Sequence, residues 1–204
     1  MPGLFVTLEG IDRSGKTTQA RLLCEALGER ALAVREPGGT VVGERVRALL
    51  KDRSILVEGR TEALLFAAAR AELVSEVIKP ALDDGKIVIS DRFLDSSLAY
   101  QGGARGLGVE EIERVNEFAT AGVRPDVTIL LDLPPAVAAE RAGVEVDRFE
   151  REGAELQERV RDAYEELAAR EPDRWVRIAA DRDPDEIHRD VLAVVERVLA
   201  GASA

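Results

Sequence analysis

Short runs of apolar residues alternate along the chain with longer segments in which apolar positions recur every three or four residues. The short runs predict buried strands, because continuous apolar runs suit a sheet that is covered on both faces. The longer segments predict helices that pack one face against that sheet. The expected strands are residues 4–9, 31–35, 87–90, 127–132 and 175–178, and the expected helices are residues 17–28, 41–50, 61–79, 94–101, 109–121, 135–142, 154–170 and 184–199.

Alternation of strands and helices favours a parallel sheet with right-handed crossovers. The sequence therefore predicts an α/β fold with a five-stranded parallel sheet and helices on both faces. In such folds ligands bind at the carboxyl ends of the strands. That rule brings the loop after the first strand together with Glu36, Asp91, Arg92 and Asp132 along one crevice.

Local signals predict where segments end. Pro80 is expected to stop helix 61–79, and the pair Gly102-Gly103 is expected to stop the helix near 94–101. No repeat or linker interrupts the chain, so we expect one domain over residues 1–204. Within it, the glycine and the many charges of residues 142–153 suit a mobile lid.

Charge and composition narrow the function. The net charge of −11 argues against a nucleic-acid polymer as partner, since such binding needs a broad basic surface, but it allows a small phosphate ligand held by a few arginines. We expect no membrane span and no signal peptide. The one cysteine, Cys24, is expected to be a small buried apolar residue, and the lack of a second cysteine fits a cytoplasmic protein.

The loop between the first strand and the first helix carries the most specific chemistry. Residues 10–17 fit the pattern G-x-x-x-x-G-K-[ST], and the strand–loop–helix context is the one that this motif requires. Its backbone N–H groups form an anion nest, Lys16 adds a cation and the Thr17 hydroxyl is a magnesium ligand. This pattern predicts binding of a nucleoside triphosphate.

Other residues are candidates for the ligand site, and some of them also have a purely structural interpretation. Asp91 follows a buried strand and suits a magnesium site, although it is also placed to cap a helix or to pair with Arg92. Arg92 suits a phosphate in the same crevice. Arg13 within the loop would lie beside a transferred phosphoryl group, unless it is only an exposed loop residue.

Two pairs of residues four positions apart lie on predicted helices. Phe66 offers a ring among alanines for a flat base, and Arg70 offers a donor on the same helix face, but their spacing alone favours a core ring and a surface ion pair of Arg70 with Glu62 or Glu72. Ser97 and Gln101 form the second pair, which by spacing alone is a polar helix face.

Taken together, these motifs resemble the thymidylate kinases. The matching runs are residues 9–19, residues 35–40, the pair Phe66 and Arg70, residues 91–93, residues 96–97 with 100–103, and residues 147–150. The resemblance implies a P-loop nucleoside monophosphate kinase fold, transfer of phosphate from ATP to dTMP, a Mg²⁺ requirement and a homodimer.

The resemblance also implies roles for particular residues. The implied ATP site is Gly10, Ile11, Asp12, Arg13, Ser14, Gly15, Lys16, Thr17, Thr18, Arg141 and Ala180; the implied dTMP site is Asp12, Glu36, Phe66, Arg70, Arg92, Ser97, Tyr100 and Gln101; the implied metal ligands are Thr17, Asp91 and Glu36. Phe66 would stack on thymine and Arg70 would contact its carbonyl, with Ser97 and Gln101 completing the base contacts. Tyr100 would crowd the sugar 2′ position.

The implied catalytic residues are Arg13, Lys16, Asp12, Arg92 and Arg148. Many bacterial members have glycine at the position of Arg13 and carry the catalytic arginine in a basic lid, whereas residues 142–146 here are acidic and apolar. We therefore assign transition-state stabilisation to Arg13 first and Arg148 second. The alternatives are a kinase for deoxynucleosides or for UMP and CMP, and a regulator that binds ATP as a switch.

Overall fold

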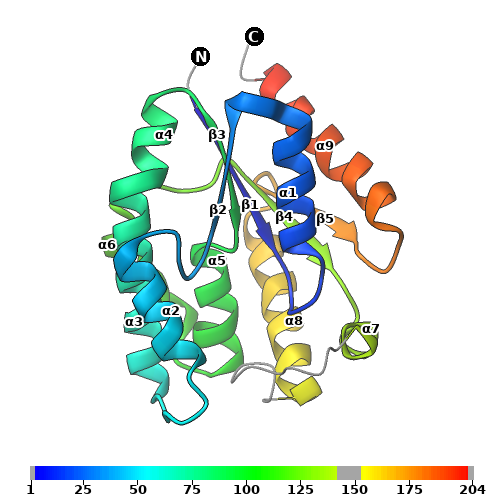
Figure 1. The fold of residues 1–204 in the computed structure, drawn as a ribbon. Helices are drawn as coiled ribbons and strands as arrows, with labels where there is room; N and C mark the ends of the chain where they lie inside the picture. The colour runs from blue at the N-terminus through cyan, green and yellow to red at the C-terminus, as the bar shows by residue number, and fades with distance from the viewer. Residues whose placement is uncertain (1–2, 142–152, 202–204) are drawn as a thin grey trace.

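A computed structural model describes residues 3–141 and 153–201, and these form a layered α/β structure (Figure 1). Its strands are β1 Leu4–Glu9, β2 Ala31–Arg35, β3 Ile87–Asp91, β4 Val127–Asp132 and β5 Trp175–Ala179. They form the predicted five-stranded parallel sheet, in which the strand order is β2-β3-β1-β4-β5. Strands β1, β3 and β4 are buried along their length, because helices cover both faces of the sheet.

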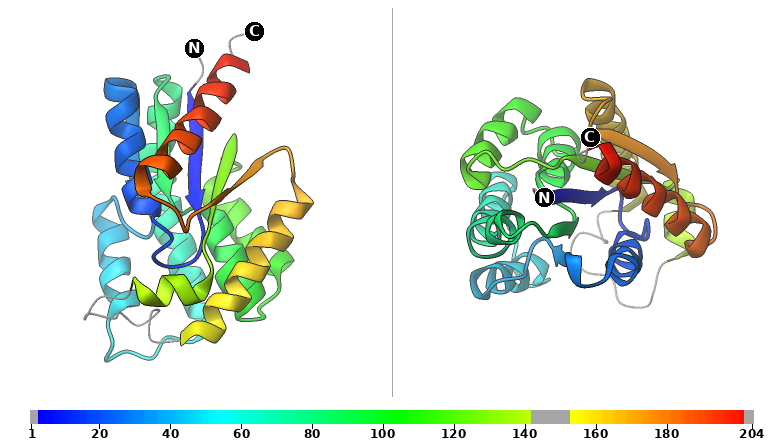
Figure 2. Two further views of the ribbon diagram at one scale, coloured as in Figure 1. Left: turned by 90° about the vertical axis from the view of Figure 1, so that its right-hand side faces the viewer. Right: turned by 90° about the horizontal axis from the view of Figure 1, so that it is seen from above.

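The helices form a layer on each side of the sheet. The α-helices are α1 Lys16–Leu27, α2 Val41–Lys51, α3 Gly59–Leu73, α4 Lys79–Asp83, α5 Leu94–Ser97, α6 Val109–Thr120, α7 Pro135–Glu140, α8 Gly153–Arg170 and α9 Pro184–Gly201; a 3₁₀ turn spans Gly28–Arg30, and π-helical segments span Val74–Ile78 and Leu98–Ala104. Helices α1 and α9 cover one face, while α6, α8 and the segment Leu94–Ala104 lie on the other (Figure 2). Helix α3 packs between α2 and α6.

Two predicted helix ends are wrong, for different reasons. Pro80 does not stop the helix that precedes it, because a π-helical turn leads directly into α4. Pro80 lies in the first turn of α4, where a backbone N–H has no partner within the helix and its absence costs no hydrogen bond. Gly102 and Gly103 lie inside the segment Leu98–Ala104. A Cβ on Gly103 would lie 2.7 Å from the Ala163 Cβ, so this glycine permits close packing against α8 and does not end the helix.

Some predicted apolar faces are exposed. Val42 and Leu49 of α2 and Phe118 of α6 lie at the surface, and Phe118 is 92% exposed. Cys24, expected to be buried, is half-buried and packs against the edge of the core. No helix among the described residues is long and apolar enough to cross a membrane.

Candidate active site

The phosphate loop joins β1 to α1 and has the backbone that its sequence predicts. Gly10 has φ 138°, and a Cβ there would lie 2.5 Å from the carbonyl oxygen of Leu131, so only glycine fits between the loop and β4. Lys16 is buried and its Nζ donates to the carbonyl oxygens of Gly10 and Ile11, at 3.1 and 2.7 Å. Burial, with nearby Arg92, lowers the pKa of Lys16 to about 8.

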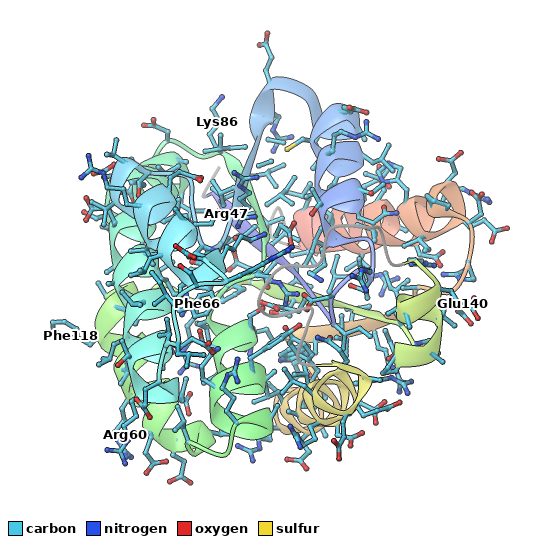
Figure 3. The ribbon with its side chains drawn as sticks, turned by 60° about the horizontal axis from the view of Figure 1, so that its bottom comes forward. Arg47, Arg60, Phe66, Lys86, Phe118 and Glu140 are labelled. Carbon is cyan, nitrogen blue, oxygen red and sulfur yellow. The ribbon has the colours of Figure 1, made fainter. Side chains whose placement is uncertain are left out.

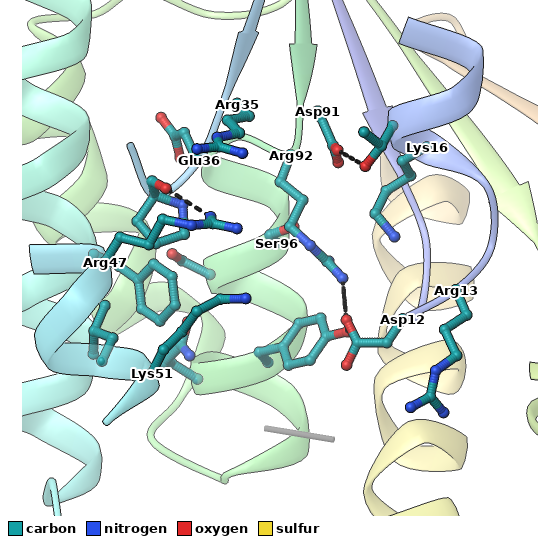
Figure 4. Close-up of a pocket in the computed structure, with 17 residues that line it drawn as sticks. Asp12, Arg13, Lys16, Arg35, Glu36, Arg47, Lys51, Asp91, Arg92 and Ser96 are labelled. Carbon is teal, nitrogen blue, oxygen red and sulfur yellow. Dashed lines mark hydrogen bonds and ion pairs between the residues drawn. The ribbon is translucent and has the colours of Figure 1, made fainter. Parts of the chain in front are cut away.

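A cavity of about 270 Å³ opens beside this loop, at the carboxyl ends of β1, β2 and β3 (Figure 4). It is lined by Asp12, Arg13, Lys16, Thr17, Arg35, Glu36, Pro37, Arg47, Leu50, Lys51, Phe66, Asp91, Arg92, Ser96, Ser97, Tyr100 and Gln101. A second hollow, lined by Arg13, Gly15, Lys16, Thr17 and Thr18, lies against the loop itself. Six basic and three acidic residues line the larger cavity, so a chain of net charge −11 has a locally cationic site. Such a site suits a small anion.

The phosphate-binding candidates lie on one wall of the cavity. The Thr17 hydroxyl is hydrogen-bonded to an Asp91 carboxylate oxygen, so Asp91 does not pair with Arg92. Among the described residues no cluster of three or more His, Cys, Asp or Glu side chains is arranged around a metal site. A magnesium ion held mostly by phosphates and water needs only one or two protein ligands, and Thr17 with Asp91 beside the loop fits that need.

Arg92 lies at the centre of a hydrogen-bond network beside the cavity. Its Nη2 lies 2.5 Å from the Asp12 carboxylate and 3.2 Å from the Tyr100 hydroxyl, and its Nη1 donates to the Gly10 carbonyl and the Ser96 hydroxyl, both at 3.1 Å. Arg92 has φ 72°, a conformation that costs a non-glycine residue about 1 kcal/mol or more. Strain of this kind persists where surrounding contacts hold it, and it is concentrated at functional sites.

Arg13 also has a left-handed backbone, with φ 64°. Glycine would adopt this conformation without strain, yet the chain keeps a long cationic side chain there. Arg13 lines both cavities and is half-buried, so it is not simply an exposed loop residue.

Arg70 is neither a surface residue nor a cavity-lining one. It is 1% exposed and pairs with Glu36, with Nε 2.8 Å from Oε2, and not with Glu62 or Glu72. Its other donors bind the Ser97 hydroxyl, the Asn116 side chain and the Phe93 carbonyl. Burial raises the pKa of Glu36, an effect that Arg70 opposes. The Glu36 Oε1 atom is buried without a hydrogen-bond partner among the described residues.

The other base-site candidates do meet in the cavity. Phe66 is half-buried and lines it, so its ring is not simply core (Figure 3). Ser97 and Gln101 are buried beside it, and not an exposed polar face. Tyr100 lies next to Asp12, and burial raises the pKa of its hydroxyl.

Two predicted residues on the far side of the phosphate loop also come together. The Arg141 guanidinium donates to the Ala180 carbonyl at 2.8 Å and to the Arg13 carbonyl at 3.2 Å. Asp132, however, does not lie along the cavity, because it pairs with Arg161 and Arg177. Arg148 and all but the last residue of the predicted lid 142–153 lie outside the described residues.

Sequence reasoning missed several residues of the site. Arg47 and Lys51 face the cavity from α2, and their spacing of four along a helix after a glycine-rich loop was the available signal (Figure 4). Arg35 also lines the cavity; it lies in the matching run 35–40, but the sequence analysis predicts no role for it. Gln157 of α8 hydrogen-bonds both the backbone N–H and the carboxylate of Asp12, at 3.2 and 2.9 Å. No local pattern predicts a contact between residues 145 positions apart.

Comparisons with known proteins give a consistent result. The sequence profile described as thymidylate kinase matches residues 8–191. The chain is 48% identical over 203 residues to a protein named thymidylate kinase from Thermoanaerobacter sp. strain X514, covering 98% of this chain and all of that protein. It is 50% identical to another of that name from Symbiobacterium thermophilum, covering 96% of this chain and 94% of that protein. The crystal structure of thymidylate kinase from Ehrlichia chaffeensis matches with a TM-score of 0.80 and 37% identity, over 96% of this chain and all of that one.

Proposed function

This chain belongs to the thymidylate kinase family and phosphorylates dTMP to dTDP in dTTP synthesis, and we propose that it transfers the phosphoryl group in line between ATP and dTMP held in the cavity described above. The observation that carries the proposal is that one cavity is lined both by Lys16 and Thr17 of the phosphate loop and by Phe66 and Gln101. A phosphate acceptor with a flat base fits between them.

ATP would bind through the phosphate loop, residues Gly10 to Thr18. The backbone nest, Lys16 and the N-terminus of α1 favour the negative charge of the phosphates. Arg141 and Ala180 would flank the adenine, a role supported by the hydrogen bond between them. Thr17, Asp91 and Glu36 would hold Mg²⁺, which when bound neutralises phosphate charge.

dTMP would bind with its base against Phe66 and its phosphate at Arg92. Ser97 and Gln101 would hydrogen-bond the base, and Arg70 would reach its carbonyl with the Nη1 group that donates to Ser97 here. Tyr100 would exclude a sugar 2′-hydroxyl, and Asp12, its neighbour, would contact the 3′-hydroxyl. The Glu36 carboxylate would lie near the acceptor phosphate and its metal.

The chemical step would rest on charge neutralisation, because phosphoryl transfer needs little covalent help from a protein. Arg13, Lys16 and Arg92 surround the space between the phosphate loop and the acceptor wall. Arg13 would stabilise the transition state, with Arg148 as the second candidate, and Asp12 would hold Arg92 in place.

Exposed apolar residues support the homodimer. Val41, Val42, Leu49, Leu64 and Phe118 are exposed on α2, α3 and α6, three helices that pack side by side. Figure 3 shows Phe118 pointing away from the molecule. We also propose that the whole chain is a single domain and that it works in the cytoplasm, where ATP and deoxynucleotides are available.

Steady-state kinetics of Phe66→Ala test the base site. Loss of a stacking ring worth about 1–3 kcal/mol should raise the KM for dTMP roughly 5- to 150-fold and leave the KM for ATP unchanged. Leu56→Ala, which truncates a side chain that is 99% exposed, is the matched control. A KM for dTMP that Phe66→Ala does not alter would contradict the proposed site.

A further inference from the structure

Glu62 is a buried carboxylate that lies behind Gln101 and does not itself line the cavity. It sits in the first turn of α3 and is 1% exposed. Its Oε1 accepts a hydrogen bond from the Gln101 side-chain Nε2 at 2.8 Å and another from Arg105 Nε at 2.7 Å. Its Oε2 accepts from Arg105 Nη2 at 3.2 Å. The mechanism above gives Glu62 and Arg105 no task.

We propose that Glu62 fixes which end of the Gln101 amide faces the base, and so makes the enzyme prefer thymine to cytosine. The inference rests on the proposed function, in that it takes Gln101 to be a base contact. Glu62 is then a positioning residue, and Gln101 is the residue that contacts the substrate.

The orientation of the Gln101 amide follows from the donors and acceptors of the two side chains. A side-chain amide has a donor end and an acceptor end, and nothing in its own shape decides which way round it sits. An ionised carboxylate only accepts hydrogen bonds. Arg105 donates to both oxygens of Glu62, and the Gln101 NH₂ group turns toward Oε1 of the same carboxylate. The amide then offers its carbonyl oxygen to the cavity that Gln101 lines.

A carbonyl oxygen at this point reads the Watson–Crick edge of the base. Thymine carries an N–H donor at N3, whereas cytosine carries a bare acceptor there. The Gln101 carbonyl oxygen therefore accepts a hydrogen bond from N3 of thymine. With cytosine, the lone pairs of the carbonyl oxygen and of N3 face each other and no hydrogen bond forms. A buried polar group left unpaired in this way discriminates strongly between substrates, here by roughly 10- to 100-fold in kcat/KM.

Burial makes this orientation durable. Gln101 is 2% exposed, so water cannot take the place of Glu62 as the partner of its NH₂ group. Gln101 also belongs to the π-helical segment Leu98–Ala104, whose backbone is held by Gly102 and Gly103 against α6 and α8. Main chain and side chain are therefore both fixed before the nucleotide arrives.

The test compares dTMP with 5-methyl-dCMP, which keeps the 5-methyl group and changes only the hydrogen-bonding edge of the base. The ratio of kcat/KM for the two substrates is measured by ADP release. Glu62→Gln keeps the size of the side chain but offers Gln101 a donor as well as an acceptor. Either end of the Gln101 amide can then face residue 62. We expect the preference for dTMP to fall by about tenfold or more, mainly through KM, with the KM for ATP unchanged.

Matched variants separate orientation from stability. Arg105→Lys loses the paired geometry of the guanidinium but keeps a cation beside Glu62, and should retain the preference for dTMP. Gln101→Met removes the amide and should lose the preference. If Glu62→Gln alone does not fold, Glu62→Gln combined with Arg105→Gln removes both charges and is measured instead.

The outcomes distinguish the inference from the proposed function. If Gln101→Met loses the preference but Glu62→Gln retains it, Gln101 reads the base and our assignment of Glu62 is overturned. An unchanged preference in Gln101→Met overturns the base-site assignment together with the inference. Equal losses in Arg105→Lys and Glu62→Gln would show a general structural effect, and would also overturn the role of Glu62.

Discussion

The buried ion pair between Arg70 and Glu36 should be a large determinant of stability as well as part of the proposed active site. The Glu36 carboxylate has one oxygen bound by two nitrogens of Arg70, and its other oxygen is buried without a partner among the described residues. Arg70→Met keeps the length of the side chain but leaves this carboxylate with no cation. Breaking one half of a buried pair costs about 3–5 kcal/mol, because the remaining charge stays desolvated.

The expected loss is large for a chain of this size. At about 2–4 °C per kcal/mol, a loss of that order lowers Tm by roughly 6–20 °C. Urea unfolding gives the free energy directly, with the single tryptophan, Trp175, as the fluorescent reporter. Trp175 lies in β5, at the opposite edge of the sheet from β2, the strand that Glu36 follows, so the substitution does not touch the reporter.

A double-mutant cycle gives the sharper result. Glu36→Gln removes the charge from the other partner, and Arg70→Met with Glu36→Gln should be destabilised by less than the sum of the two single variants, with a coupling of about 0.5–3 kcal/mol. Arg60→Met is the control, because Arg60 is an exposed arginine of the same helix (Figure 3). A cost of less than about 1 kcal/mol for Arg70→Met, as for a surface ion pair, would refute the reasoning.

Three further predictions concern catalysis, pH and assembly. Arg13→Ala should lower kcat roughly 10³-fold with little change in the KM for dTMP, and equal losses in both would contradict a transition-state role. Burial, with the nearby Asp95 charge, raises the pKa of Glu9 from its usual 4.5 to about 7, so its contribution to stability is present below pH 4.5 and lost as pH rises through 7. Relative to Glu9→Gln, the wild type should therefore lose up to about 3 kcal/mol of unfolding free energy between pH 4.5 and 8, and parallel pH profiles would show that Glu9 is not desolvated. Phe118→Asp should convert the proposed homodimer to a monomer in analytical ultracentrifugation, and a wild type that sediments as a monomer would remove the dimer proposal.

Local pattern was sufficient for the sheet and the phosphate loop. Continuous apolar runs identified all five strands to within one residue, and the motif around Gly10 and Lys16 specified both the backbone and the strand–loop–helix context. The resemblance to a known family, and not spacing, singled out Phe66 and Gln101, which the structure brings to one cavity.

The surroundings of several site residues depend on long-range contacts, which the sequence does not reveal. By spacing, Arg70 was expected at the surface, since nothing near it in sequence reveals Glu36 and Asn116 as partners. The contact of Gln157 with Asp12 depends on the packing of α8, which no local rule supplies. The sequence predicts a helix stop at Gly102 and Gly103, because their packing against α6 and α8 appears only in the folded chain.

The most direct test of the central claim is ADP release measured with ATP, Mg²⁺ and a panel of nucleoside monophosphates. We expect strong turnover on dTMP, weak turnover on dUMP, and none on the thymine ribonucleotide, whose 2′-hydroxyl would meet Tyr100. UMP and CMP should be poor acceptors, and thymidine should not be phosphorylated. ADP release at the same rate with and without any monophosphate would leave the phosphate loop as an ATP site but would contradict the kinase assignment.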